Sequence, residues 1–436
     1  MPICDLIDWE SAQTRSRIKE GNQLRPHLLL IGGDDHALRI PFMLALREHG
    51  FRVTAAATAD PAPFVRTGID FKPFRCYRFI NPLADLNAIN TFSQLLADVQ
   101  PDLVQSFNPK PNLLVPLAAR GLRDVVIVRT INGLAWTYSS SSPLAVGVRP
   151  LYRALHRLAA RSTTATIFQN QDDKTFFERH GMTGKGLSRL IPGSGIDPER
   201  FERARAAGPS PAQLREQLGL GSSEVVITVS RMTRHKGIPT LLEAAAMVHE
   251  ARPGVRFLLV GPRQSEGRLA VTQAAIDRHA PYVMAIGPRS DVPALLGMAD
   301  VFAFPTEYRE GVPRVLLEAA LARLPIVTTT MPGCTDVIRD GWNGVLVPPR
   351  APRILAAKII DLLRDRETDK AMGERAANFV AQEFNLGLTA ARYAALYSEL
   401  FDRGHRKNGS NWTSEREYEH CQMTQVTAAR GEELAG

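Results

Sequence analysis

The sequence contains few cysteines and no long apolar run. Its 436 residues include four cysteines that stand far apart, without a CxxC pair or a histidine at metal-ligand spacing: Cys4, Cys76, Cys334 and Cys421. This pattern is typical of reduced structural thiols and argues against a disulfide framework. No stretch approaches the roughly 18 uninterrupted apolar residues of a membrane-spanning helix. Because the first residues carry acids where a secretory signal needs basic residues and an apolar core, we expect a cytoplasmic protein.

Two signatures of other protein classes are also missing. The glycines of IGGDDH (31–36) do not form GxGxxG, and the adjacent acids would repel a pyrophosphate. The alternative that the protein is an NAD-dependent oxidoreductase is therefore unsupported, because the motif that binds the dinucleotide is missing. Aromatic residues make up 7% of the chain and form no stacking motif, which argues against a nucleic-acid partner.

Acidic residues are absent from one long segment. No acid lies between Asp124 and Asp172, and residues 61–171 hold 12 Lys/Arg against five Asp/Glu in a chain of net charge +8. A clustered positive field of this kind favours an anionic partner, such as phosphate groups or a membrane surface.

Strand-like apolar runs alternate with helical patterns twice along the chain. The first series begins at HLLLIGG (27–33) and the second at EVVITVSR (224–231). Such alternation predicts an α/β protein with two Rossmann-like, doubly wound domains. We expect an N-terminal extension (1–26), a first domain (27–198), a linker (199–223), a second domain (224–385), a closing helix (386–403) and a disordered tail (404–436). Within the linker, residues 204–224 suggest a flexible connection and a short helix.

Two carboxylates stand eight residues apart where a strand leads into a helix. Glu310 precedes the helix that Pro313 opens, and Glu318 lies within it. The backbone amides of this turn can hold a phosphate or a sugar hydroxyl, and the carboxylates can accept hydrogen bonds from vicinal diols. The donor-binding turn comprises Gly311, Val312, Arg314 and Val315. Alternatively, Glu310 only caps the helix and Glu318 is solvated, although its apolar neighbours would make a buried carboxylate seek a partner.

A basic loop follows the first strand of the second domain. Arg231 and Lys236, five residues apart in SRMTRHKG, can clamp two phosphates from one side. The alternative is a solvated basic loop without a ligand.

Together these two motifs resemble the GT4 family of GT-B glycosyltransferases, and the resemblance extends over residues 27–402. It implies two domains that face a cleft, with Glu310 on the donor sugar and Glu318 on the ribose. The implied clamp, Arg231 and Lys236, neutralises the departing diphosphate. The loop GPRSDV (287–292), with Arg289 and Asp291, is implied to lie near the nucleotide base.

The N-terminal half resembles enzymes that extend polyprenyl-diphosphate-linked glycans for exopolysaccharide, capsule or O-antigen. The resemblance implies an acceptor or cleft surface that includes Gly32, Gly33, Lys110 and Asn132. Many GT4 relatives carry a histidine where this chain has Asn132. An amide can hydrogen-bond a sugar hydroxyl, but it cannot carry a proton at neutral pH.

Four arginines recur at every fourth residue in RPLYRALHRLAAR, and they are predicted to cover one side of a helix: Arg149, Arg153, Arg157 and Arg161. Because no acids accompany them, we expect this side to meet anionic headgroups or the acceptor's diphosphate. The alternative is an ordinary amphipathic helix with a solvated face.

The resemblance and these residues predict a retaining glycosyltransferase of the hexosyltransferase class. It would move a hexose or N-acetylhexosamine, with a UDP-linked donor favoured, to a lipid-linked glycan at the inner face of the plasma membrane. No two aspartates stand two residues apart, so the DxD metal motif is absent and we expect neither metal nor cofactor. Alternatives are a soluble or lipopolysaccharide-core enzyme that uses GDP-mannose or another donor, and an inactive scaffold.

Overall fold

The computed structural model describes residues 25–407, except 77–80, 123, 140–141, 264–266 and 268. Most of the expected N-terminal extension and tail therefore lies outside the described residues. Internal contacts divide the chain after Ala394, so both sheets described below belong to one compact unit.

The first sheet has seven parallel strands in the order β3-β2-β1-β4-β5-β6-β7. Its inner strands are short apolar runs that are buried on both faces, as parallel strands between helices are. The strands are β1 (His27–Ile31), β2 (Arg52–Ala57), β3 (Asp70–Pro73), β4 (Leu103–Ser106), β5 (Val126–Ile131), β6 (Ala165–Phe168) and β7 (Leu187–Leu190).

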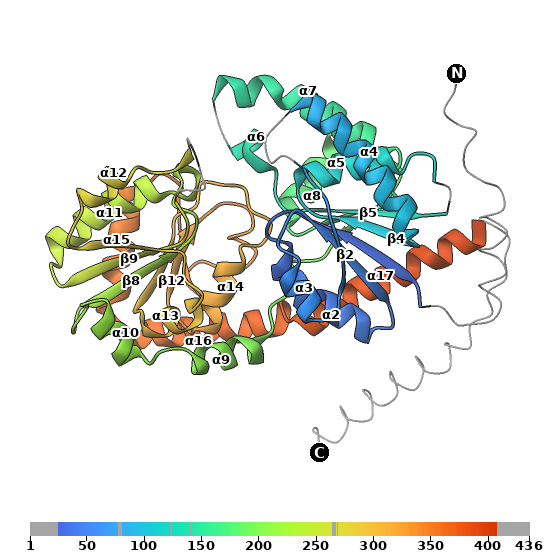
Figure 1. Ribbon diagram of the computed structural model, residues 1–436. Coiled ribbons are helices and arrows are strands. Elements are labelled where there is room, and N and C mark those ends of the chain that lie inside the picture. Colours follow the sequence, from blue (N-terminus) through green and yellow to red (C-terminus); the bar gives the residue numbers. More distant parts are fainter. Residues whose placement is uncertain are drawn as a thin grey trace, which may run out of the picture. The chain divides into compact units, whose positions relative to one another are not determined.

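Helices connect these strands, and two of them, α4 and α5, share a core cluster with β1, β2, β4 and β5. The helix α7 packs on α5 and α6 (Figure 1). The helices are η1 (His36–Arg39), α2 (Ile40–Glu48), α3 (Ala62–Arg66), α4 (Pro82–Val99), α5 (Pro109–Ala118), α6 (Ala135–Ser139), α7 (Pro143–Ala160) and α8 (Gln171–Arg179).

The second sheet has six parallel strands in the order β10-β9-β8-β11-β12-β13. They are β8 (Glu224–Val229), β9 (Val255–Val260), β10 (Val283–Gly287), β11 (Val301–Phe304), β12 (Ile326–Thr329) and β13 (Val345–Val347). Both sheets place β1 or β8 at a point where the strand order reverses. Loops at the carboxyl ends of the strands beside such a point form the usual ligand site of an open α/β sheet.

Two separate core clusters cover the faces of the second sheet. One involves α11 and α15, and the other involves α9, α10, α13, α14 and α16 (Figure 1). The helices are α9 (Pro198–Ala207), α10 (Pro211–Gln217), η2 (Arg234–Lys236), α11 (Ile238–Ala251), α12 (Gln273–Asp277), α13 (Val292–Met298), α14 (Arg314–Leu321), α15 (Pro352–Arg364), α16 (Arg366–Glu383) and α17 (Leu386–Lys407).

The segment expected to combine a flexible connection with a short helix, 199–223, contains two helices. It contains most of α9 and all of α10, and both pack against α13. Asp197 caps α9, and Ser210 forms a capping box with Gln213 at the start of α10. These caps satisfy the first amides of each helix, and buried side chains from both helices join the core of the second sheet.

Candidate active site

The two loops that carry the predicted clamp and carboxylates are held together by the backbone. Gly237 follows Lys236 with φ +70°, and a Cβ atom there would lie 1.8 Å from the carbonyl oxygen of Pro305. Only glycine permits this approach. The Glu307 amide also donates to the His235 carbonyl at 2.9 Å. The loop after β8 therefore lies directly against the loop after β11.

This contact brings Lys236 and Glu310 together although 74 residues separate them. The ammonium of Lys236 forms an ion pair and hydrogen bond with the Glu310 carboxylate, and the two side chains are only 12% and 15% exposed. The Lys236 Nζ atom also lies 5.3 Å from the centre of the Phe304 ring and 5.8 Å from that of Tyr308. The aromatic walls and partial burial strengthen the pair by limiting its contact with water.

Glu310 is not the cap of α14. Its carboxylate accepts hydrogen bonds from Lys236 and from Thr306 Oγ1, the latter at 3.3 Å, whereas Pro313 occupies the N-cap position of the helix. The capping alternative is therefore wrong. Arg231 lies half-buried at the start of the same basic loop, and its charge helps to lower the pKa of His235 after the larger effect of burial.

Side chains of the first domain hold the backbone of the Glu310 loop. Asn170 Nδ2 donates to the Glu310 carbonyl at 2.9 Å, while its Oδ1 accepts from the Asp173 amide and caps α8. Gln169 Oε1 accepts from the Val312 amide at 3.2 Å, so this amide of the predicted donor turn is already engaged. Arg309 pairs with the buried Asp173 at 3.3 Å.

Gln169, Asn170 and Asp173 were not identified from the sequence as residues that contact the Glu310 loop. The one available signal was local, because an asparagine before two aspartates is typical of a helix N-cap. Nothing in the sequence indicates that the same amide reaches a loop 140 residues away. Burial raises the pKa of Asp173 to about 6, even though Arg309 and Asn170 favour its ionised form.

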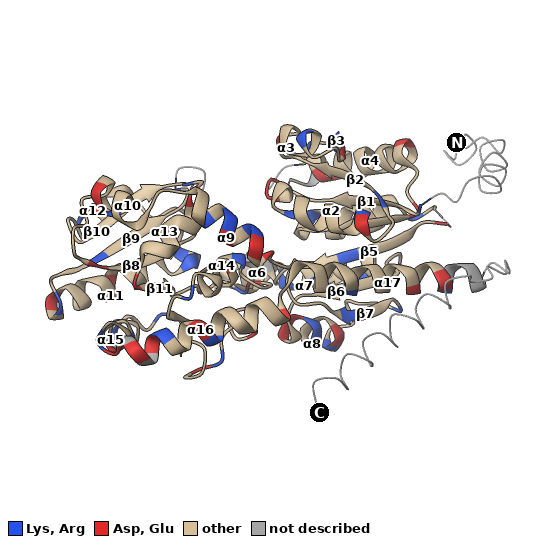
Figure 2. Cartoon of the chain, turned by 90° about the horizontal axis from the view of Figure 1, so that it is seen from below, with Lys and Arg blue, Asp and Glu red and all other residues tan. Residues whose placement is uncertain are grey.

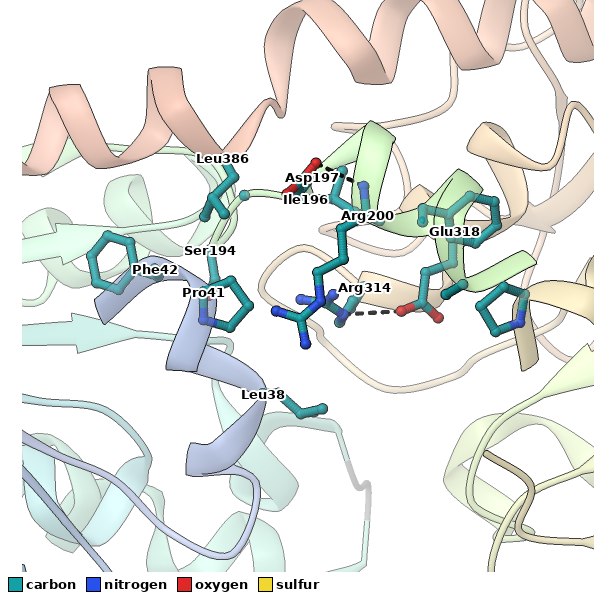
Figure 3. Close-up of a pocket in the computed structure, with 14 residues that line it drawn as sticks. Leu38, Pro41, Phe42, Ser194, Ile196, Asp197, Arg200, Arg314, Glu318 and Leu386 are labelled. Atoms are coloured by element: carbon teal, nitrogen blue, oxygen red, sulfur yellow. Dashed lines mark hydrogen bonds and ion pairs between the residues drawn. The ribbon is translucent and has the colours of Figure 1, made fainter. Parts of the chain in front are cut away.

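Glu318 lines a pocket of about 110 Å³ together with Arg314. Arg314 Nε lies 3.0 Å from Glu318 Oε1, and Glu318 is 22% exposed. The carboxylate is therefore paired and mostly buried rather than solvated, and burial raises its pKa. Figure 3 shows Arg200 of α9 beside this pair, with Leu38 and Pro41 across the pocket. Arg200 was not singled out from the sequence.

The predicted base-proximal residues are engaged with one another. Arg289 donates to both carboxylate oxygens of Asp291, at 2.8 and 2.5 Å, in a bidentate pair. The hydrogen bond from Arg289 lowers the pKa of Asp291. The pair lies in the turn before α13, and the Arg289 side chain is only partly exposed.

The two glycines after β1 contact other parts of the first domain, which the sequence did not indicate. A Cβ atom on Gly32 would overlap the ring of His36 at 2.0 Å, so a side chain at this position would displace the buried histidine. The Gly33 amide donates to Asn108 Oδ1 at 2.9 Å and is occupied as well. Burial and Arg39 lower the pKa of His36 to about 3.

The remaining predicted acceptor residues lie at the carboxyl ends of β4 and β5. Lys110, in the first turn of α5, pairs with Asp85 at 2.5 Å. Asn132 follows β5, and its Oδ1 is shielded from solvent without a hydrogen-bond partner among the described residues.

The expected arginine face of α7 is only partly present. Arg157 and Arg161 are exposed, whereas Arg149 and Arg153 are half-buried. The Arg149 guanidinium lies over the ring of Tyr138 and donates to the Thr137 carbonyl. Exposed apolar side chains also stand on this helix. We call the two leucines, which are seven residues apart and so lie on the same side, the α7 ridge: Leu144 and Leu151, which are 68% and 59% exposed. Val146, 46% exposed, lies on another side.

Other surface helices differ from α7 in charge. Figure 2 shows acids and bases side by side on α8 and α15, whereas α7 carries bases alone. No helix within the described part of the chain combines the length and apolar character needed to cross a bilayer.

Two family models match the chain in consecutive segments. The model described as "Glycosyl transferase 4-like domain" matches residues 42–187, and that described as "Glycosyl transferases group 1" matches residues 212–379. Together they account for more than half of the sequence. The first contains strands β2 to β6 of the first sheet, and the second contains all six strands of the second sheet.

Known proteins resemble the chain over most of its length. The N,N'-diacetylbacillosaminyl-diphospho-undecaprenol alpha-1,3-N-acetylgalactosaminyltransferase of Campylobacter jejuni is 24% identical over 373 residues, covering 85% of this chain and 96% of that protein. The GDP-mannose-dependent alpha-(1-6)-phosphatidylinositol monomannoside mannosyltransferase of Mycolicibacterium smegmatis is 28% identical over 299 residues, covering 66% and 73%.

A solved structure has the same fold. HepE from Anabaena, in complex with UDP and glucose, superposes with a TM-score of 0.70 at 21% identity and covers 86% of this chain and 100% of that one. The expected GT-B architecture is thereby confirmed. The chain belongs to the group 1, GT4-like glycosyltransferases, enzymes of the GT-B fold that use nucleotide sugars.

Proposed function

We propose that the enzyme transfers a hexose or N-acetylhexosamine, with retention of configuration, from a UDP-linked donor to a lipid-linked glycan in cell-envelope polysaccharide synthesis. The main support for placing the active site here is the Lys236–Glu310 ion pair, which lies where the loops after β8 and β11 meet. A cation and a carboxylate at this position suit the two ends of the bond that breaks, the phosphate oxygen and the sugar.

In the proposed reaction, the bond between the anomeric carbon and the diphosphate oxygen breaks while the acceptor hydroxyl oxygen attacks from the same face. The departing phosphate oxygen takes the hydroxyl proton, so no protein base is required. Lys236 and Arg231 stabilise the charge that gathers on the diphosphate. Glu310 orients the sugar, and Glu318 accepts hydrogen bonds from the ribose once Arg314 moves aside.

The acceptor assignment rests on two supports. The Campylobacter relative's name specifies an undecaprenol-diphosphate acceptor, and the Mycolicibacterium relative's name specifies a phosphatidylinositol glycolipid. The α7 ridge and the exposed arginines after it suit peripheral contact with an anionic membrane, inserting leucines while arginines meet headgroups. The second relative also makes GDP-mannose the alternative donor.

A donor screen tests the proposal. Release of nucleoside diphosphate is measured for UDP-hexoses, UDP-N-acetylhexosamines and GDP-mannose, with and without a polyprenyl-diphosphate-linked sugar. We expect a UDP-sugar to react and the lipid acceptor to accelerate release. Activity with GDP-mannose alone would favour the alternative donor, and acceleration by a water-soluble oligosaccharide alone would contradict the lipid acceptor.

The same assay tests whether the reaction requires a divalent metal ion. Because we assign neutralisation of the diphosphate to Lys236 and Arg231, turnover should be unchanged within about twofold by excess EDTA. A steep loss that Mg²⁺ or Mn²⁺ restores would contradict this assignment.

Substitution of the two carboxylates should affect different properties of the enzyme, nucleotide affinity in one case and turnover in the other. Glu318→Gln should weaken binding of free nucleoside diphosphate about tenfold, because the ribose loses a charged acceptor. Glu310→Gln should leave that affinity unchanged and lower turnover about tenfold, because its partner is the sugar. Calorimetry and turnover at saturating donor measure the two effects. Equal nucleotide affinity in wild type and Glu318→Gln would remove the ribose assignment.

A further inference from the structure

The backbone on both sides of Glu310 is attached to the first domain. The Arg309 amide donates to Ser139 Oγ at 3.0 Å. The Glu310 carbonyl accepts from Asn170 Nδ2 at 2.9 Å. The Arg309 carbonyl also lies so close to Gly133, after β5, that a Cβ atom there would come within 2.3 Å of it. The first domain therefore determines where this backbone lies, although Glu310 belongs to the second.

Asn170 makes its contact from the turn between β6 and α8, where its side chain is completely buried. Its Oδ1 accepts from the Asp173 amide at 2.8 Å and so caps α8, while its Nδ2 donates to the Glu310 carbonyl. A cap alone could be supplied by serine, threonine or aspartate. The carboxamide differs because it carries its acceptor and its donor on separate atoms, so one side chain can serve the helix and the loop together.

A second contact ties the same loop to the start of α8. Arg309 Nη2 lies 3.3 Å from the carboxylate of Asp173, whose side chain is fully buried. Two neighbouring residues of the loop are thus attached to one helix end, Arg309 through its side chain and Glu310 through its carbonyl. The Glu310 carboxylate is held from the other direction by Lys236. Its position is therefore fixed by contacts from both domains.

Glu310 is assigned to orient the transferred sugar, and reactivity at such a centre depends steeply on position. A displacement of about 1 Å, caused by a change away from the reacting atoms, can reduce a rate about 100-fold. We propose that Asn170, assisted by Ser139, is a positioning residue that keeps Glu310 in the geometry required for sugar transfer. This role rests on the proposed function, since it has an effect only if Glu310 contacts the donor sugar.

Asn170→Ser separates the two contacts of this side chain, because serine still caps the helix but lacks the amide that donates to Glu310. Turnover at saturating donor should fall about tenfold. The affinity for free UDP or GDP, measured by calorimetry, and the melting temperature should stay close to those of the wild type. Ser139→Ala removes the acceptor of the Arg309 amide and should lower turnover about threefold.

The decisive measurement is the effect of Asn170→Ser in a Glu310→Ala background. Once the carboxylate is gone its position no longer matters, so Asn170→Ser should lower the remaining turnover less than about twofold. A residue that acts only through the stability or the general shape of the fold would reduce turnover by the same factor in both backgrounds.

Two further variants control for stability. Asn170→Ala removes the cap together with the amide, so it should match the turnover of Asn170→Ser and have a lower melting temperature. Ser210→Ala removes the capping box of α10 in the second domain. It should lower the melting temperature without changing turnover.

Near-normal turnover in folded Asn170→Ser, or an equal loss in both backgrounds, would show that Asn170 only caps α8 and would overturn its positioning role. If Asn170→Ser does not fold, Ser139→Ala is compared in the same two backgrounds, and the same two results overturn the proposal. Those outcomes leave the proposed function intact. If the wild type instead releases no nucleoside diphosphate from any nucleotide sugar, the proposed function itself is wrong, and the positioning role falls with it.

Discussion

Replacing Lys236 by alanine is expected to reduce turnover about 100-fold or more, and Arg231→Ala should have an effect of similar size. Each change removes a cation that stabilises charge on the departing diphosphate, and the loss of one such preorganised partner typically has this magnitude. Turnover is measured at saturating donor, so that weaker binding does not account for the loss.

Because Lys236 pairs with Glu310, Lys236→Ala should also lower the stability of the fold. Removal of the ammonium leaves a mostly buried carboxylate without its counterion, which destabilises the fold in its own right. The double variant Lys236→Ala/Glu310→Gln removes this uncompensated charge. It should recover the melting temperature but not the turnover, because the diphosphate still lacks its partner.

Arg234→Ala provides a matched control for both variants. Arg234 lies in the same 3-10 turn as Lys236, and it is exposed. Its removal should change turnover less than twofold, since it is not assigned to the diphosphate. If Lys236→Ala or Arg231→Ala retained near-normal turnover, that residue would have no part in the mechanism.

The inner strands could be predicted from sequence because each is an apolar run bounded by turns. Three edge strands, β3, β7 and β13, have no such run in the sequence and read DFKP, LSRL and VLV. Such segments bury fewer side chains, so their hydrophobic signal is weak. They become strands because a neighbouring strand supplies the hydrogen bonds.

In residues 199–223 the sequence predicts one short helix, whereas the structure has two. Gly208, Pro209 and Ser210 suggested a flexible connection, yet Ser210 and Gln213 form a capping box, which is a helix-start signal already present in the sequence. Here the turn composition marks the short gap between two helices rather than an unstructured segment.

The site was predictable only where its chemistry is local. The chemical types at Glu310, Glu318, Arg231 and Lys236 could be read from two motifs, although their roles came from the resemblance. The contacts of Asn170 with the Glu310 loop could not, because they join loops from different sheets. Arg129 lies within a buried strand, so its guanidinium must have hydrogen-bond partners. The sequence did not indicate that His156 is one of them.

The orientation of α7 was likewise undetermined by its sequence, and it changes how membrane contact should be tested. The four-residue spacing predicted an outward arginine side, whereas packing on α5 and α6 turns Leu144 and Leu151 outward. Because burial of a leucine stabilises by roughly 1.5–3 kcal/mol, these side chains should contribute more to bilayer binding than arginines at about 1 kcal/mol each.

We therefore expect Leu144→Asp/Leu151→Asp to weaken binding to liposomes of phosphatidylcholine and phosphatidylglycerol about 100-fold, equivalent to about 2.7 kcal/mol. Binding is measured by sedimentation at low and high salt. Arg157→Glu/Arg161→Glu should weaken it mainly at low salt, because headgroup attraction is screened within a Debye length of about 10 Å at 0.1 M. The leucine variant should keep its melting temperature, since Leu144 and Leu151 are exposed. Arg157→Glu also removes a hydrogen bond to the His180 carbonyl at 2.8 Å, so the melting temperature of the arginine variant is measured alongside its binding.

Ile354→Asp is the matched control, because Ile354 is an exposed aliphatic residue, 45% accessible, on α15 of the other domain. It should leave liposome binding unchanged. The leucine variant should also raise the KM for the lipid acceptor while the KM for the donor stays constant, because only the acceptor resides in the bilayer. Equal liposome binding by wild type and the leucine variant would show that the α7 ridge is not the membrane contact. Loss in the arginine variant alone, abolished by salt, would instead indicate a purely electrostatic face.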